Sequence, residues 1–342
     1  IYLVDESQIV HVYRNLRVEY GFQHGRIMED LDEAITLLTG ASARADKAEI
    51  SVEVAYGLRA RANLLMGKWA AAASDAAKAY GTSAPYSVAD VSQPTFYNAT
   101  DNAWIWGIVV TTEDYLAKTG IVNWPSNLCS LTGMGYTTAA SATDVAYRLI
   151  NKNLWAKIPE TDVRKGWWVD EDLHSPVLDN GLGEDYAYYW ANGMFNGGTF
   201  PSKFSPYTNV KFGPDNGTFA DTDNAQDWPL MRVEEMKLIE AEALGRDNLA
   251  TGKQKLEEFV RQYRDPSYTC TAGSLDAFID EVWFQRRVEL WGEGFALFDI
   301  LRLKKPIIRQ GANYPINSTF AEIAAEAPIM IYRIPEAETS VN

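Results

Sequence analysis

Small residues recur at helical spacing in the first hundred residues. Glycine ends two successive segments there, because Ala48 to Met66 stops at Gly67 and Trp69 to Tyr80 stops at Gly81. Glycine often terminates a helix, so we expect two helices joined by a tight turn. The predicted contact face is made of small residues, which let two helix backbones approach closely, and one aromatic ring past the turn: Ala60, Gly67, Ala72, Ala76, Ala79 and Trp69.

The order and spacing of these residues resemble a tetratricopeptide repeat. An amphipathic helix over 27–38 precedes the hairpin. In the last third, Met231 to Leu244 and Leu249 to Tyr263 predict a second, weaker repeat-like hairpin, in which Lys253 stands where the repeat has a small residue. A further helix is predicted from Leu275 toward Gly294.

The middle of the chain, residues 82–229, differs in composition from both ends. Glycine, proline, asparagine and threonine are common there, and charges are sparse. We expect long loops with a short strand over Ala103 to Val110 and a few helices, such as Thr143 to Lys152. Loops of this length in a compact protein are usually functional. The predicted fold is therefore mostly α, with tetratricopeptide-like hairpins supporting an irregular loop-rich face.

Charge excludes several classes of partner. The chain has 46 acidic and 31 basic residues and a net charge of −15, with no basic run longer than two residues. Nucleic acid and anionic membranes attract clusters of Lys and Arg, so neither is an expected partner. No run of 18 apolar residues occurs. Cys129 and Cys270 have no metal or redox spacing, and the sequence leaves open whether they pair.

Three segments carry a family signature: Glu29 to Tyr80, Arg232 to Arg264, and QRRVELWGEGFALFDILR over Gln285 to Arg302. Together they resemble the SusD/RagB family, and the third segment is the most specific. The closing Ile331 to Asn342 also resembles the family's terminal segment. Two departures stand out, because the family usually has Glu where this chain has Gln285 and Arg where it has Ala296. The resemblance implies one SusD-like domain with a helical part (1–81), a loop-rich ligand-binding part (82–229) and a C-terminal helical part (230–342).

The resemblance also implies a location and partners. Family members are lipoproteins on the outer face of the bacterial outer membrane, where they bind glycans or other nutrients and cover a SusC-like TonB-dependent transporter. The chain starts at Ile1 without a signal peptide, so we interpret it as a mature or truncated fragment whose lipid-anchored N-terminal segment is not present. No cofactor is implied.

Charged residues near the C-terminus are expected to form a structural network. The participants are Arg286, Arg287, Glu289, Glu293, Asp299 and Arg302. Unpaired buried charges are rare, which favours arginine–carboxylate bonding over a metal site. The three histidines lack the Glu-x-x-His spacing of di-iron sites.

Aromatic residues supply the candidate ligand site. The chain has 11 Trp and 18 Tyr, and most Trp residues, including Trp167 and Trp168, fit core packing. Six rings lie in polar or glycine-rich segments without a helical period, and a ring can cover the apolar face of a sugar. The predicted ligand-binding residues are Trp124, Tyr136, Tyr186, Tyr188, Tyr189 and Trp190.

Two alternative functions remain at this stage. A tetratricopeptide-type scaffold would bind a protein or peptide in a concave helical groove. A carbohydrate-active hydrolase would place two carboxylates across a cleft, and Asp170, Glu171 and Asp172 lie near Trp167 and Trp168. The sequence carries no GxSxG, HExxH, Walker A or GxGxxG motif. We therefore expect a binding protein and no enzymatic activity.

Overall fold

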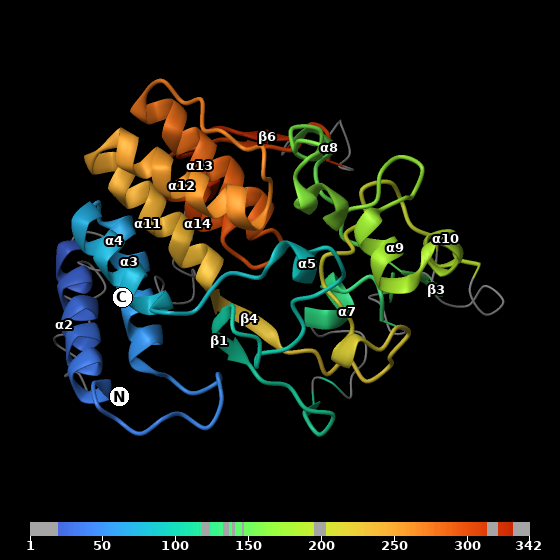
Figure 1. Cartoon of the computed structure of the whole chain (residues 1–342), viewed down its shortest axis with the longest axis horizontal. Coiled ribbons are helices and arrows are strands. Elements are labelled where there is room, and N and C mark those ends of the chain that lie inside the picture. Colours follow the sequence, from blue (N-terminus) through green and yellow to red (C-terminus); the bar gives the residue numbers. More distant parts are fainter. Residues whose placement is uncertain are drawn as a thin grey trace, which may run out of the picture.

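The protein is mostly helical, as predicted (Figure 1). The computed structural model describes residues 20–115, 117, 124–132, 137–138, 141–145, 147–194, 203–312 and 321–330. The longer helices are α2 (Tyr20–Leu38), α3 (Val52–Leu65), α4 (Trp69–Tyr80), α11 (Val233–Asp247), α12 (Leu249–Tyr263) and α13 (Leu275–Glu289). They stack side by side in this order and form the helical half of the molecule.

The remaining elements are short, and most of them lie in the loop-rich half. The short helices are α5 (Val88–Val91), α7 (Trp124–Leu128), α8 (Lys152–Trp155), α9 (Pro176–Leu182), α10 (Glu184–Ala191), α14 (Ala296–Arg302), and the 3-10 turns η1 (Val163–Trp167), η3 (Asp215–Gly217) and η4 (Pro328–Met330). Within the described ranges the strands form three antiparallel pairs: β1 (Trp104–Ile108) with β4 (Trp228–Arg232), β2 (Thr137–Thr138) with β3 (Ser141–Val145), and β5 (Ile307–Ile308) with β6 (Glu322–Ile323). The strand predicted over Ala103 to Val110 is confirmed as β1.

The first hairpin, α3 and α4, packs through the small residues that the sequence indicated. Ala60, Ala72 and Ala76 are fully buried, and Ala79 is nearly so. Gly67 adopts φ +69°, which reverses the chain between the helices, and the ring of Trp69 lies against it. The far side of α4 packs on α11, so the beginning and the last third of the chain share one core.

Enlarging this contact is expected to destabilise the protein. Ala76→Leu adds three carbons at a fully buried position, so we expect the free energy of unfolding to fall by about 1–3 kcal/mol. Ala71→Leu, on the exposed side of the same helix, is the control. Urea unfolding followed by circular dichroism measures both, and equal stabilities would refute the close-packed interpretation.

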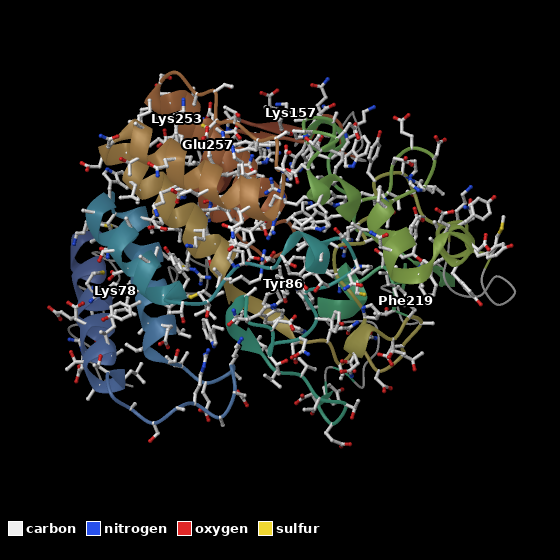
Figure 2. The ribbon with its side chains drawn as sticks, viewed as in Figure 1. Lys78, Tyr86, Lys157, Phe219, Lys253 and Glu257 are labelled. Atoms are coloured by element: carbon white, nitrogen blue, oxygen red, sulfur yellow. The ribbon has the colours of Figure 1, made fainter. Side chains whose placement is uncertain are left out.

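In the second hairpin, the backbones of α11 and α12 come into contact at residue 252, one residue before the position where the repeat pattern has a small residue. A Cβ atom on Gly252 would lie 2.3 Å from the Cα of Gly245, so the two backbones touch at these glycines. Lys253, labelled in Figure 2, is half-buried, and its Nζ donates to the carbonyl of Ala272 (2.8 Å). The small residue expected at Lys253 is thus supplied by Gly252.

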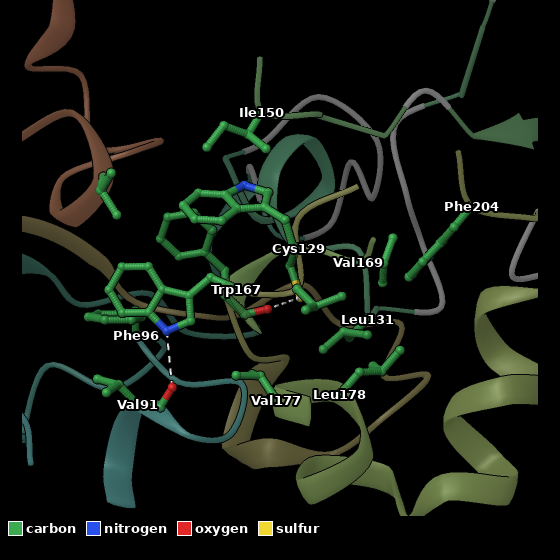
Figure 3. Close-up of a cluster of buried hydrophobic side chains, with 14 of the residues drawn as sticks. Val91, Phe96, Cys129, Leu131, Ile150, Trp167, Val169, Val177, Leu178 and Phe204 are labelled. Carbon is green, nitrogen blue, oxygen red and sulfur yellow. Dashed lines mark hydrogen bonds between the residues drawn. The ribbon is translucent and has the colours of Figure 1, made fainter. Parts of the chain in front are cut away.

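The loop-rich half is organised around a second aromatic core (Figure 3). Trp167 and Trp168 are fully buried, which confirms their predicted packing role, and Trp167 Nε1 donates to the carbonyl of Val91 (3.0 Å). Cys129 lies in this core, whereas Cys270 lies in the core of the α11–α13 helices, so the two are separate buried thiols. The helix predicted over Thr143 to Lys152 is wrong. Its first residues pair as β3, and only Lys152–Trp155 is helical, beginning after the Asn151 cap.

A buried ionic network joins the two halves. Glu289, on α13, accepts hydrogen bonds from Arg164 of η1, Arg232 of β4 and Arg264 after α12. All four side chains are fully buried. The predicted pairing is confirmed for Asp299 with Arg286 and Arg302, and Arg302 also binds Glu242 of α11. Glu289 and Glu293 pair instead with cations outside the predicted set, and Glu293 binds Arg232 and Lys211. The inclusion of Arg287 is wrong, because its guanidinium lies over the ring of Trp283 and pairs with no carboxylate among the described residues.

Acid is expected to destabilise the protein through this network. Burial by itself would raise the pKa values of these carboxylates. Adjacent cationic groups, mainly guanidinium groups, lower the pKa values by a larger amount, so Glu242, Glu289, Glu293 and Asp299 have pKa values below their ordinary ones. Burial raises the pKa of Glu234, which acts in the opposite direction. Groups with a lowered folded-state pKa stabilise the protein above the unfolded-state pKa and lose that contribution as the pH falls. The melting temperature should therefore drop steeply from about pH 5 to pH 3. Asp299→Asn should flatten this drop, whereas the exposed Asp276→Asn should not.

Candidate functional site

The tyrosine-rich segment is a helix and not an irregular loop. Gly183, at φ +81°, separates α9 from α10, and Ala187, Trp190 and Ala191 of α10 are buried. These three residues have the i, i+3, i+4 spacing of a helix whose one face is buried, a signal that the sequence analysis overlooked. Because the buried face takes up these positions, the tyrosines are directed outward.

Three tyrosines form the exposed surface of α10. The exposed fractions are 58% for Tyr186, 58% for Tyr188 and 48% for Tyr189. The rings of Tyr188 and Tyr189 contact each other edge to face at a centroid distance of 5.9 Å. Exposed large rings are scarce on folded proteins unless they bind something, and three on one short helix form a candidate recognition surface. We refer to Tyr186, Tyr188 and Tyr189 as the α10 tyrosine surface.

A small cavity adjoins this surface. It has a volume of about 250 Å³, and its described lining residues are Leu182, Tyr186, Trp190, Phe219 and Ala220. Phe219 lies on the loop-rich side of the molecule (Figure 2), and its ring is 6.4 Å from that of Trp190. Tyr186 thus stands at the rim of an apolar cavity. The carboxylates of Glu184 and Asp185, exposed in the first turn of α10, supply hydrogen-bond acceptors beside it.

Trp190 belongs to the core and not to the ligand surface. It is only 2% exposed, and its Nε1 donates to the carbonyl of Ser130 (3.1 Å). Trp190 touches the wall of the small cavity, but its ring is enclosed and its N–H is satisfied, so it offers no exposed ring face for stacking. The prediction that Trp190 is a stacking residue is corrected on this ground.

The other two predicted rings lie apart from α10 in sequence. Trp124, on α7, is half-buried and packs edge-on against Phe212 at 4.8 Å, with Trp228 at 6.2 Å. Part of this ring remains accessible, so Trp124 stays a candidate contact. Tyr136 lies outside the described residues.

A second cavity tests the hydrolase alternative. It has a volume of about 370 Å³ and is lined by Trp155, Trp168 and three carboxylates, among other residues. Each carboxylate already bonds within the protein: Glu160 pairs with Lys165, Asp162 with Arg164, and Asp170 accepts from the backbone N–H groups of Asp172 and His174. Glycoside hydrolysis needs a facing acid and base that are available to substrate. Asp162 is buried in its pair with Arg164 and does not face the cavity as a free acid, whereas Glu160 stays exposed beside Lys165.

The described part of the chain holds no group of three His, Cys, Asp or Glu residues placed to bind a metal ion. Within the same residues, no helix is both long enough and apolar enough to cross a membrane. A further cavity of about 440 Å³ lies between α3 and α14, next to the exposed side chains of Leu65 and Phe298. This hollow lies in the helical half, and Phe295 and Ile239 also line it.

The fold and surface define a class: a helical-hairpin protein that carries a loop-rich aromatic face. Residues 136–336, more than half of the chain, match the SusD family. The chain therefore belongs to the SusD family, in agreement with the resemblance of its C-terminal motif. No curated protein matches the chain.

Solved structures show the same fold. A SusD-like carbohydrate binding protein from Bacteroides vulgatus ATCC 8482 is 21% identical, with a TM-score of 0.65, and a SusD superfamily protein from Bacteroides thetaiotaomicron VPI-5482 is 20% identical, also at 0.65. Each similarity covers 93% of this chain but 64% of the other chain, so this chain spans less than two thirds of their length. Surface glycan-binding protein A from Bacteroides thetaiotaomicron, in complex with laminarihexaose, is 14% identical with a TM-score of 0.59, covering 93% of this chain and 68% of that one.

Proposed function

We propose that this chain is a non-catalytic glycan-binding protein of the bacterial cell surface. It captures an oligosaccharide or polysaccharide and passes it to a SusC-like TonB-dependent transporter. The observation that carries the proposal is the α10 tyrosine surface, three exposed rings on a helix of eight residues. Aromatic rings stack on the apolar faces of sugars, while neighbouring carboxylates and amides accept hydrogen bonds from the hydroxyl groups.

Family membership supports the proposal. A relative with the same fold binds laminarihexaose, which makes a neutral glycan the first ligand class to test. The cell-surface location, the lipid anchor and the transporter partner follow from the family resemblance and are part of the same proposal.

A binding screen tests the proposed function. In native gels that contain neutral polysaccharides, the protein should migrate more slowly with at least one glycan, and a reducing-end assay on the same mixtures should detect no new sugar ends. Sustained product formation would favour the hydrolase. Unchanged migration across a broad glycan panel would contradict the proposal that the protein captures glycans.

Removal of the exposed rings should weaken binding without unfolding the protein. We expect Tyr186→Ala or Tyr189→Ala to reduce the binding free energy by roughly 1–3 kcal/mol, because each side chain is a surface anchor. The loss should be nearly independent of salt, because stacking involves no ion pair. Calorimetric titration with the glycan found in the screen measures both effects.

Tyr115→Ala is the matched control, since Tyr115 is 80% exposed but lies outside α10. Trp124→Ala tests the second candidate ring. Full binding by both α10 variants, with a loss in Trp124→Ala, would move the site to α7. Full binding by all of these variants would exclude both locations.

A further inference from the structure

A separate cavity in the helical half combines aromatic rings with cationic groups. It has a volume of about 420 Å³, within the range of small-molecule sites, and lies where α13, α14 and β5 meet the start of α8. In Figure 1, α13 and α14 belong to the helical half, whereas α10 lies at the far end of the loop-rich half. Its lining includes Trp283, Arg286, Arg287, Trp291, Phe295 and Asp299.

Arg287 is a cation without a protein counter-ion in the described part of the chain. Its guanidinium carbon lies 4.8 Å from the centroid of the Trp283 ring. Burial lowers the pKa of Arg287, and no described carboxylate opposes this effect. The neighbouring Arg286 is paired, because its Nε donates to Asp299 Oδ2 (2.8 Å). Partial burial of an unpaired guanidinium is unfavourable unless an anion joins it.

Two more donors in the cavity wall have no acceptor among the described residues. They are Arg286 Nη1 and Trp283 Nε1, and both are buried. An unsatisfied buried donor costs about 1–3 kcal/mol, and more when it is charged. Both atoms are shielded from solvent, so of the two arginines in this wall the half-buried Arg287 is the one that a ligand in the cavity can reach.

The carboxylates near the cavity do not fill this need. Both oxygens of Asp299 already accept hydrogen bonds, one from Arg286 and one from Arg302. Lys305, whose Nζ lies 5.4 Å from the Trp283 ring, adds a cation that pairs with Asp280. Two arginines and one aspartate leave the lining with a local charge of +1, in a chain whose net charge is −15.

We propose that this cavity binds an acidic sugar, with its carboxylate or sulfate group at Arg287 and its ring against Trp291 and Phe295. The planar guanidinium donates two parallel hydrogen bonds to a carboxylate or sulfate, a geometry that a neutral hydroxyl does not match. The evidence for an anion site comes from this cavity alone. That the anion is carried by a sugar rests on the proposed function.

The test compares glucuronate, glucose 6-sulfate, glucose and acetate at constant ionic strength. Tryptophan fluorescence and thermal melts of the full chain report binding, because Trp283 and Trp291 line the cavity and a ligand stabilises the folded state. Glucuronate or glucose 6-sulfate should bind, glucose should not, and the tighter of the two acidic sugars identifies the anionic group. Acetate alone should bind more weakly, because it lacks the ring.

Arg287→Met should weaken the binding of the acidic sugar by roughly 10- to 100-fold while the fold survives, since Arg287 takes no part in the ionic network. Arg287→Lys should retain part of the affinity, and Arg261→Met, an exposed arginine on α12, should retain all of it. Equal responses to glucuronate and glucose, or unchanged affinity in Arg287→Met, would overturn the proposal. Acetate binding as strong as glucuronate would reduce the site to a simple anion site. Neutral-glycan binding by the α10 variants is measured separately, so the two proposals fail independently.

Discussion

Glu289→Gln is expected to lower the free energy of unfolding by about 3–5 kcal/mol, the range typical of breaking a buried ion pair by removing one partner. The Glu289 carboxylate accepts from Arg264 Nε (2.8 Å) and Arg264 Nη2 (2.9 Å), and also from Arg164 and Arg232 at 3.3 and 3.4 Å. None of these side chains is exposed to solvent. Glutamine has a similar shape, so the loss of negative charge is the main change, and its amide group would face guanidinium groups.

Urea denaturation followed by circular dichroism measures this effect. Asp276→Asn is the matched control, because it removes a carboxylate from the exposed first turn of the same helix. A loss below about 1 kcal/mol for Glu289→Gln, the range of surface ion pairs, would mean that the three arginines are stabilised by other groups. Glu234 and Glu293 are the nearest alternatives, since both bind Arg232.

Gly252→Val should be the most damaging change in the second hairpin. Even a Cβ atom at residue 252 would lie 2.3 Å from the Gly245 Cα, 2.6 Å from the Gly245 backbone nitrogen and 2.9 Å from the Ala241 carbonyl oxygen. These are backbone atoms, so no side-chain rotation relieves the overlap and α11 and α12 must separate. We expect a loss of about 3 kcal/mol or more, at or above the upper end of overpacking effects.

Gly273→Ala provides the control for the glycine substitution itself. A Cβ atom there meets no atom within 4 Å, and the residue does not need a positive φ. Thermal melts should show a large decrease for Gly252→Val and little change for Gly273→Ala. Similar melting temperatures for the two variants would show that the helices can separate at low energetic cost.

Local patterns predicted the helical half well. Helices α4 and α12 begin and end at the predicted residues, because Gly67, Gly81 and Asn248 delimit them and their apolar or small residues repeat at helical spacing. That the buried charges of α13 are paired was also predictable, but their partners lie on other elements, such as Arg264 for Glu289 and Asp299 for Arg286. Gln285, noted as a departure from the family, accepts a hydrogen bond from Arg164 (2.5 Å) and so takes part in the network without a charge.

Long-range packing decided the rest. The sequence by itself determined the helical hairpins and the resemblance to the SusD family, both of which depend on residues close together in the chain or on one continuous motif. The tertiary structure supplied the partners of Glu289, because Arg164 and Arg232 lie far from it in the sequence. The tertiary structure decided which rings are exposed: Trp190 turns inward to meet the carbonyl of Ser130, 60 residues earlier, while the tyrosines beside it point outward. It also excluded Arg287 from the network, because Asp299 lies beside Arg286. Local sequence does not show which of two neighbouring rings is buried or which of two neighbouring arginines is paired. The groups that decide this, Ser130 for Trp190 and Asp299 for Arg286, lie on other elements of the fold.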